Sequence, residues 1–128
     1  MKILLGTDLV DISRIKKLAK TTSFIDRNFS KAEIELFESK GKNVFQTIAG
    51  NFCAKEACIK AIGNYIEKYS FKEIEILRKN SGKPFIRFNG RLTPLNDKLS
   101  SHVSISHTDS IAMATVVFWK KSQTKQEK

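Results

Sequence analysis

Glu56 is the first carboxylate in this sequence that asks for an explanation. Residues 44–62 carry apolar side chains at helical spacing, and at a helical step Glu56 falls within roughly 40° of Phe52, near the middle of the apolar stripe. An ionised carboxylate in such a place is costly unless it is paired or binds a metal. Lys60, four residues later, offers an ordinary helical ion pair. Spacing alone supports the ion pair as well as it supports a functional role.

Asp8 is the second such carboxylate. It follows apolar residues 3–5 and Gly6-Thr7, a pattern that predicts a short strand ending in a turn. Asp8 would then either cap the helix expected near Asp11 or meet Glu56 at one cation. Mg²⁺ typically uses one or two protein carboxylates, keeps several waters and binds phosphate oxygens. The pair Asp8 and Glu56 therefore predicts a magnesium site for chemistry at phosphate.

Two further segments contain residue types that bind anions. His107 ends a strand pattern beside Ser106 and before Asp109, but a hydrolase triad is not supported, because no G-x-S-x-G elbow is present and neighbours on one strand cannot form a triad. We expect His107 to bind a phosphate instead. Gly82-Lys83-Pro84 is either a hairpin turn or the rim of an anion site, and it lacks the spacing of a P-loop.

The elements that must position these residues follow an α+β pattern. We expect a largely antiparallel sheet packed with a long central helix, in one domain over residues 1–119 with a polar basic tail at 120–128. The predicted elements are a strand at 3–5, a helix at 11–20, a helix at 30–39 opened by a Ser30/Glu33 capping box, a helix at 44–62, a hairpin at 74–88 and a hairpin at 103–119.

Composition limits the class of protein. With 128 residues, of which 41% are hydrophobic, the chain suits one folded domain, and no stretch is long enough for a signal-peptide core or a membrane span. The net charge of +10 favours an acidic partner without choosing between nucleic acid, a phosphorylated small molecule and an acidic protein. Cys53 and Cys58 cannot bridge from one helix, which favours free thiols and a cytoplasmic location.

Four blocks of sequence together resemble the holo-acyl-carrier-protein synthase family, the short homotrimeric type of 4′-phosphopantetheinyl transferase. They are GTDLVDISRI at 6–15, KEACIKAIG at 55–63, GKPFIRFNG at 82–90 and VSISHTDSIAMATVV at 103–117. The resemblance implies an α+β fold, a homotrimer with active sites between subunits, and a role in fatty acid biosynthesis. The implied reaction moves the phosphopantetheine arm of coenzyme A to a serine of apo acyl carrier protein and releases adenosine 3′,5′-bisphosphate.

The resemblance also implies roles for individual residues. Asp8 and Glu56 would hold Mg²⁺ on the pyrophosphate of coenzyme A, with Lys60 beside it. Arg14 would dock the acidic carrier protein, which gives the positive net charge a use. The remaining positions would line the coenzyme A pocket, and they are Lys83, Pro84, Ser106, His107 and Thr108.

One position departs from the family pattern. The family usually has an arginine shortly before the Lys-Glu-Ala of the central helix, where this chain has Asn51 ahead of Phe52. The substitution would remove a contact to phosphate or to a partner. Lys55 or another basic residue would have to replace it.

Two other classes of function are weighed against the transferase. A small basic nucleic-acid-binding domain fits the charge, but the phenylalanines fall at core-like positions, no RNP-type stacking motif is present, and the carboxylate at Glu56 has no use there. We therefore expect no nucleic-acid partner. A metal-dependent phosphohydrolase shares the carboxylate pair, but it would need an activated water and usually more acidic ligands.

Overall fold

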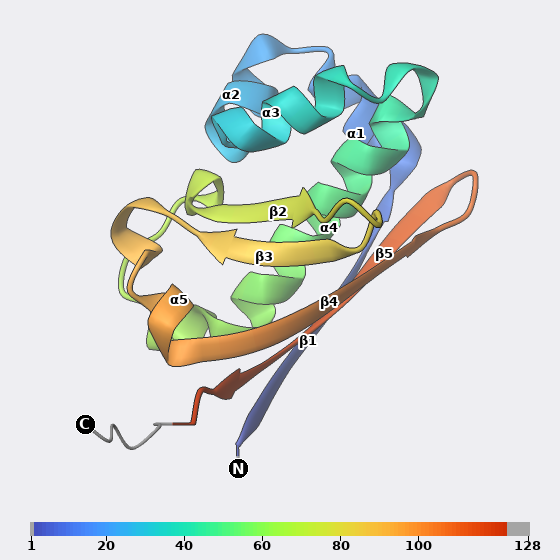
Figure 1. Cartoon of the computed structure of the whole chain (residues 1–128). Coiled ribbons are helices and arrows are strands. Elements are labelled where there is room, and N and C mark those ends of the chain that lie inside the picture. Colours follow the sequence, from blue (N-terminus) through green and yellow to red (C-terminus); the bar gives the residue numbers. More distant parts are fainter. Residues whose placement is uncertain (1, 123–128) are drawn as a thin grey trace.

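The computed structural model describes residues 2–122, and the fold prediction is confirmed: the chain is an α+β domain with antiparallel strands packed around one long helix (Figure 1). Short 3-10 turns lie at 41–43, 63–65, 71–73 and 90–92. The helices and strands are β1 Ile3–Asp11, α1 Ile12–Ala19, α2 Thr22–Asn28, α3 Lys31–Glu38, α4 Val44–Ile62, β2 Ile74–Arg78, β3 Pro84–Phe88, α5 Leu95–Lys98, β4 Leu99–His107 and β5 Ile111–Lys120.

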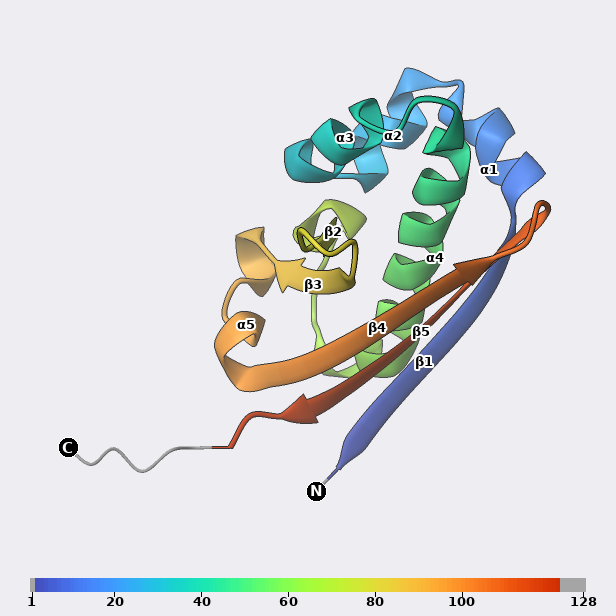
Figure 2. The same cartoon turned by 45° about the vertical axis from the view of Figure 1, so that its right-hand side comes forward.

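The strands form two antiparallel sheets. In the larger sheet β5 lies between β1 and β4, and β2 pairs with β3 in a separate hairpin. Helix α4 runs along one face of the larger sheet, with the hairpin beside it (Figure 2). Side chains of β5 alternate between the two faces. Those that face α4 are fully buried, namely Ala112, Ala114, Val116 and Phe118.

The first strand is longer than the sequence predicts, and the turn expected at Gly6 to Asp8 is wrong. β1 continues to Asp11 and pairs with β5 throughout. Gly6 faces α4 at a point where a Cβ atom would lie 1.9 Å from the carbonyl oxygen of Ala57. The glycine therefore allows strand and helix to pack closely instead of turning the chain. Asp8 lies within the strand and caps no helix, because α1 begins only after Asp11.

The remaining helix and hairpin predictions differ in their success. The helix at 44–62 has the predicted bounds, the Ser30/Glu33 capping box is present, and both hairpins form, with β4 starting earlier, at Leu99. Helix α2 was not predicted from the sequence. Only one of its seven residues, Phe24, is buried, and a single buried side chain gives no helical periodicity. The Phe24 ring packs against the rings of Phe29 and Phe52, a tertiary contact that local sequence does not reveal.

The predicted tail lies largely outside the described residues. β5 extends to Lys120, one residue into the predicted tail, and the Lys121 ammonium donates to the carbonyl of Asn96 at 2.8 Å. Residues 123–128 are not described. Within residues 2–122, no helix is both long and apolar enough to cross a bilayer.

A buried ion pair joins α3, α4 and the hairpin. Lys55 and Glu33 are both fully buried, and Lys55 Nζ lies 2.6 Å from Glu33 Oε1. Lys55 also donates to the carbonyls of Phe71 and Ile74, at 2.7 and 2.5 Å. Burial raises the pKa of Glu33 and lowers the pKa of Lys55, although the partner's charge opposes each shift. Glu33 therefore has two roles: it completes the capping box of α3, and it is the counter-ion of the buried Lys55.

The ion pair between Glu73 and Arg91 should make stability depend on pH in the acid range. Hydrogen bonds from the Arg91 side chain lower the pKa of Glu73 to about 2, from an ordinary value of 4.5. Because the folded pKa is the lower one, the stabilisation is present above pH 4.5 and is lost as the pH falls towards 2. Arg91→Gln should therefore lower the melting temperature clearly at pH 7 and much less at pH 3.

Arg27→Gln is the matched control, since Arg27 has no ion-pair partner within residues 2–122. Its effect on the melting temperature should not depend on pH in this range. An equal loss for Arg91→Gln at pH 7 and pH 3 would show that the Glu73 carboxylate is not the partner that matters.

Candidate active site

Asp8 and Lys60 meet where β1 crosses α4. Lys60 Nζ donates to Asp8 Oδ1 at 3.0 Å and to the carbonyl of Thr7 at 3.1 Å. The helical ion pair between Glu56 and Lys60 does not form, so the ion pair that the spacing allowed does not explain Glu56. Lys60 instead contacts Thr7 and Asp8 on β1, so the Glu56 carboxylate has no ion pair with Lys60.

Glu56 lies half-buried on the wall of a groove of about 560 Å³ that α1, α2, α4 and residues 69–71 line. Within residues 2–122 its carboxylate accepts no hydrogen bond from another residue. Burial raises the pKa of Glu56, and the nearby Asp8 carboxylate raises it further, while Lys60 and Arg14 act in the opposite direction. The Asp8 charge therefore disfavours ionisation of Glu56, and within residues 2–122 the Glu56 carboxylate has no hydrogen-bond or ion-pair partner.

This pair of carboxylates suits a hard cation with oxygen ligands. A divalent cation would remove the repulsion that raises the pKa of Glu56. In the described part of the chain no cluster of three or more His, Cys, Asp or Glu could hold a metal, so waters and a phosphate substrate would complete the shell, as Mg²⁺ prefers. Cys53 donates its thiol to the carbonyl of Asp8 at 3.0 Å, and burial raises its pKa to about 12. Cys53 is therefore a neutral structural neighbour.

A second cavity lies at the far edge of the sheet, where two of the residues predicted to bind coenzyme A meet. Its volume is about 390 Å³, and it includes Pro84 after the hairpin turn and His107 at the end of β4. His107 Nδ1 lies 3.0 Å from the carbonyl oxygen of Thr108. That oxygen can only accept, so Nδ1 carries a proton and Nε2 is left for a ligand. The other lining residues are Asn43, Gln46, Thr47, Arg78, Gly82 and Ile105.

Three of the predicted pocket residues do not line this cavity. Lys83 is exposed in the turn between two lining residues. Ser106 pairs with Met113 and lies on the opposite face of the sheet from His107. The Thr108 hydroxyl accepts from the amides of Ser110 and Ile111, at 3.2 and 3.1 Å. Thr108 thus stabilises the β4–β5 turn.

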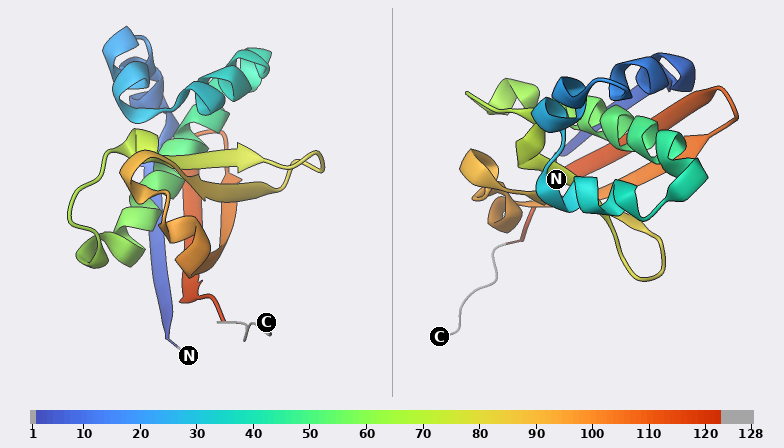
Figure 3. Two further views of the ribbon diagram at one scale, coloured as in Figure 1. Left: turned by 60° about the vertical axis from the view of Figure 1, so that its left-hand side comes forward. Right: turned by 90° about the horizontal axis from the view of Figure 1, so that it is seen from above.

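Helix α4 separates the two groups of residues. Asp8 lies on β1 and His107 on β4, which are opposite edges of the three-stranded sheet. Seen from above, α1 and the β2–β3 turn lie on opposite sides of α4 (Figure 3). One chain therefore contains the carboxylate pair Asp8 and Glu56 and the cavity at Pro84 and His107, but it does not bring them together.

The sequence did not single out Arg78, which lines the second cavity. The only signal for it was the departure at Asn51, because the amide oxygen of Asn51 accepts from Arg78 Nη2 at 2.9 Å. Lys55, the replacement considered from the sequence, is fully buried against Glu33 and cannot reach a ligand. Arg14, predicted to dock a partner, lines the same groove as Glu56.

The sequence and the fold of this chain are similar to those of one family of known proteins. The family model described as the 4′-phosphopantetheinyl transferase superfamily matches residues 4–116. The holo-[acyl-carrier-protein] synthase of Clostridium beijerinckii is 42% identical over 91% of this chain and 97% of its own. The crystal structure of the Helicobacter pylori synthase with coenzyme A has a TM-score of 0.77 at 35% identity, covering 91% of this chain and all of that one. A Bacillus anthracis synthase structure gives 0.77 at 32% identity, over 93% and 96%.

The chain therefore belongs to the 4′-phosphopantetheinyl transferase superfamily. Within it, the chain belongs to the holo-acyl-carrier-protein synthases, enzymes that transfer phosphopantetheine from coenzyme A to apo acyl carrier protein. This assignment decides in favour of the transferase over the nucleic-acid-binding domain and the phosphohydrolase.

Proposed function

We propose that this transferase holds Mg²⁺ with Asp8 and Glu56 and binds coenzyme A so that the pyrophosphate lies at that pair. The observation that carries the proposal is the carboxylate of Glu56, half-buried, repelled by Asp8 and free of a protein partner in the described residues. The ion would bind pyrophosphate oxygens and offset their negative charge. Lys60, already bonded to Asp8, adds a positive charge beside the reacting phosphate.

The proposed reaction is a single phosphoryl transfer. The hydroxyl oxygen of a carrier-protein serine bonds to the β-phosphorus of coenzyme A, and the bond from that phosphorus to the bridging oxygen breaks. The serine proton passes to solvent water, and adenosine 3′,5′-bisphosphate leaves with the electron pair of the broken bond. Positioning and charge stabilisation supply most of the rate in such transfers, so Asp8, Glu56 and Lys60 act by orienting and neutralising phosphate oxygens.

The acidic carrier protein would approach the α1 side of the groove. Arg14 lines the groove beside Glu56, and Lys16 and Lys17 lie in the last turn of the same helix. Complementary charge of this kind steers association and fixes the orientation of the partner. The serine would then enter the groove from the side on which the carboxylates lie.

The two cysteines, Cys53 and Cys58, are free and buried thiols, which supports a cytoplasmic location for the enzyme.

We also propose that the enzyme is a homotrimer, as its resemblance to the family implies. The sheet face opposite α4 carries exposed apolar side chains, with 62% of Leu5 and 65% of Leu9 exposed, and Met113 lies next to Leu9 on β5. Apolar surface of this kind on a soluble enzyme marks an interaction site, and a second copy of the chain is the natural occupant. A neighbouring subunit would also supply what one chain lacks, a carboxylate pair beside an anion pocket.

Mixing two impaired variants tests whether the site is shared. Glu56→Gln impairs the carboxylate half and His107→Ala the pocket half, and each homotrimer should transfer far more slowly than the wild type. Each mixed trimer should contain one site that combines two intact halves, so about a quarter of all sites should be intact when equal amounts of the two variants assemble at random, because each site draws one half from each neighbour. Transfer should therefore reappear at that level, with native mass spectrometry confirming mixed trimers. Mixed trimers no faster than the two variants alone would show that each site lies within one chain.

A further inference from the structure

Arg78 ends strand β2 with its side chain held in place rather than free. Its Nη2 donates to the amide oxygen of Asn51 at 2.9 Å, and its Nη1 donates to the carbonyl of Leu77 at 3.3 Å. Asn51 is fully buried and is itself fixed, since its Nδ2 donates to Glu33 Oε2 at 3.0 Å and to the carbonyl of Ile76 at 2.8 Å. A rigid core amide therefore orients this guanidinium.

Arg78 forms no ion pair with a carboxylate in residues 2–122, although the charge of Glu33 acts on it from a longer distance. Lys55, which is fully buried, is paired with Glu33. Arg78, which is half-buried, has no carboxylate within 4.0 Å in residues 2–122. Its partners Asn51 and Leu77 are neutral acceptors, and they use two of the five N–H groups of a guanidinium. Arg78 lines the cavity that contains Pro84 and His107, so N–H groups that its bonds to Asn51 and Leu77 leave free are available to a ligand there.

We propose that Arg78 binds the 3′-phosphate of coenzyme A and so takes over the place of the arginine that the family usually has at position 51. In this chain the cation comes from β2, and Asn51 has become its support. The inference rests on the proposed function, because it takes the second cavity as the nucleotide half of the site. A half-buried guanidinium with free donors recognises phosphate by charge-assisted and often bidentate hydrogen bonds.

The 3′-phosphate is the group that fits this position. Coenzyme A has two anionic parts, a pyrophosphate and a 3′-phosphomonoester on the ribose. The pyrophosphate is assigned to Asp8, on the opposite edge strand β1, and to Glu56 and Lys60 on the neighbouring helix α4. The phosphomonoester then needs its own cation, and Arg78 is the Lys or Arg side chain that lines the second cavity.

Dephospho-coenzyme A, which lacks only the 3′-phosphate, tests the proposal. The wild-type enzyme should prefer coenzyme A, and Arg78→Gln should lower that preference in kcat/KM by about 10- to 100-fold, the effect of losing a hydrogen bond to a charged group. The loss should appear mainly in KM for coenzyme A, with dephospho-coenzyme A used almost as well as before. Arg78→Lys should retain part of the preference, because a point charge replaces the fork.

The control is Lys79→Gln, a change of the neighbouring exposed residue on the same hairpin, which should leave the preference unchanged. Calorimetry provides a readout that does not depend on turnover: adenosine 3′,5′-bisphosphate should bind the wild type more tightly than adenosine 5′-phosphate, and Arg78→Gln should abolish the difference. A folded Arg78→Gln variant that keeps both preferences would overturn the proposal. Absence of transfer by the wild type would instead count against the proposed function.

Discussion

Glu56→Gln is expected to slow phosphopantetheine transfer by about 100-fold or more and, at the same time, to stabilise the fold. Charge stabilisation at the reacting phosphate is worth several kcal/mol in such sites, so loss of one metal-binding carboxylate is costly. The stabilisation follows from the raised pKa of Glu56, since burial and Asp8 disfavour the ionised form in the folded chain at pH 7. Steady-state kinetics and urea unfolding at pH 7 measure the two effects.

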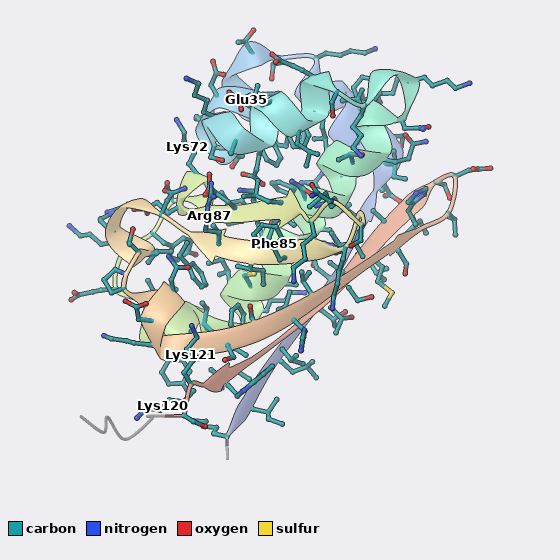
Figure 4. All side chains as sticks on the ribbon, viewed as in Figure 1. Glu35, Lys72, Phe85, Arg87, Lys120 and Lys121 are labelled. Carbon is teal, nitrogen blue, oxygen red and sulfur yellow. The ribbon has the colours of Figure 1, made fainter. Side chains whose placement is uncertain are left out.

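The matched control is Glu35→Gln on α3. Glu35 is an exposed glutamate whose side chain projects from the helix surface (Figure 4). It should change neither the rate nor the free energy of unfolding appreciably. A Glu56→Gln enzyme that transfers at the wild-type rate would remove Glu56 from the site. A slow but destabilised variant would show that Glu56 acts through structure.

Lys55→Met is expected to lower the free energy of unfolding by about 3–5 kcal/mol, since removing one partner leaves the other buried charge uncompensated. The carboxylate of Glu33 would keep its hydrogen bonds from the Ser30 and Ile76 amides but lose the ammonium at 2.6 Å. The carbonyls of Phe71 and Ile74 would lose their donor as well. Urea denaturation at pH 7 measures the loss.

Two comparisons separate the ion pair from a general effect of removing a lysine. Lys72→Met, at an exposed lysine labelled in Figure 4, should have little effect. The double variant Lys55→Met/Glu33→Gln should regain part of the stability, because the orphaned charge is gone. A double variant that is less stable than Lys55→Met by the full cost of Glu33→Gln alone would show that the two residues are not coupled.

Local periodicity in the sequence was enough to predict much of this fold. The helix at 44–62 has its predicted bounds because its apolar residues repeat over five turns, and Glu56 stood out against that repeat. Glu33 was predicted as a cap because its partner Ser30 is three residues away. In each of these cases the interaction that decides the structure is short in sequence.

Long-range contacts account for what the sequence did not reveal. Gly6 resembles a turn residue until the backbone of Ala57 is placed against it, and no local pattern predicts that approach. Lys60 forms its ion pair with Asp8, 52 positions away, instead of with Glu56 on its own helix. Arg78 reaches Asn51 from another element, so the substitution at Asn51 was visible in the sequence while its consequence was not.

The most direct test of the central claim is the intact mass of an apo acyl carrier protein after incubation with this enzyme, coenzyme A and Mg²⁺. The account predicts a gain of one phosphopantetheine on the carrier serine, abolished by EDTA, restored by added Mg²⁺, and absent with Asp8→Ala or Glu56→Ala. Transfer that continues in EDTA, or with both carboxylates removed, would contradict the proposed site. No mass gain on any of several carrier proteins, from a folded enzyme, would contradict the transferase function itself.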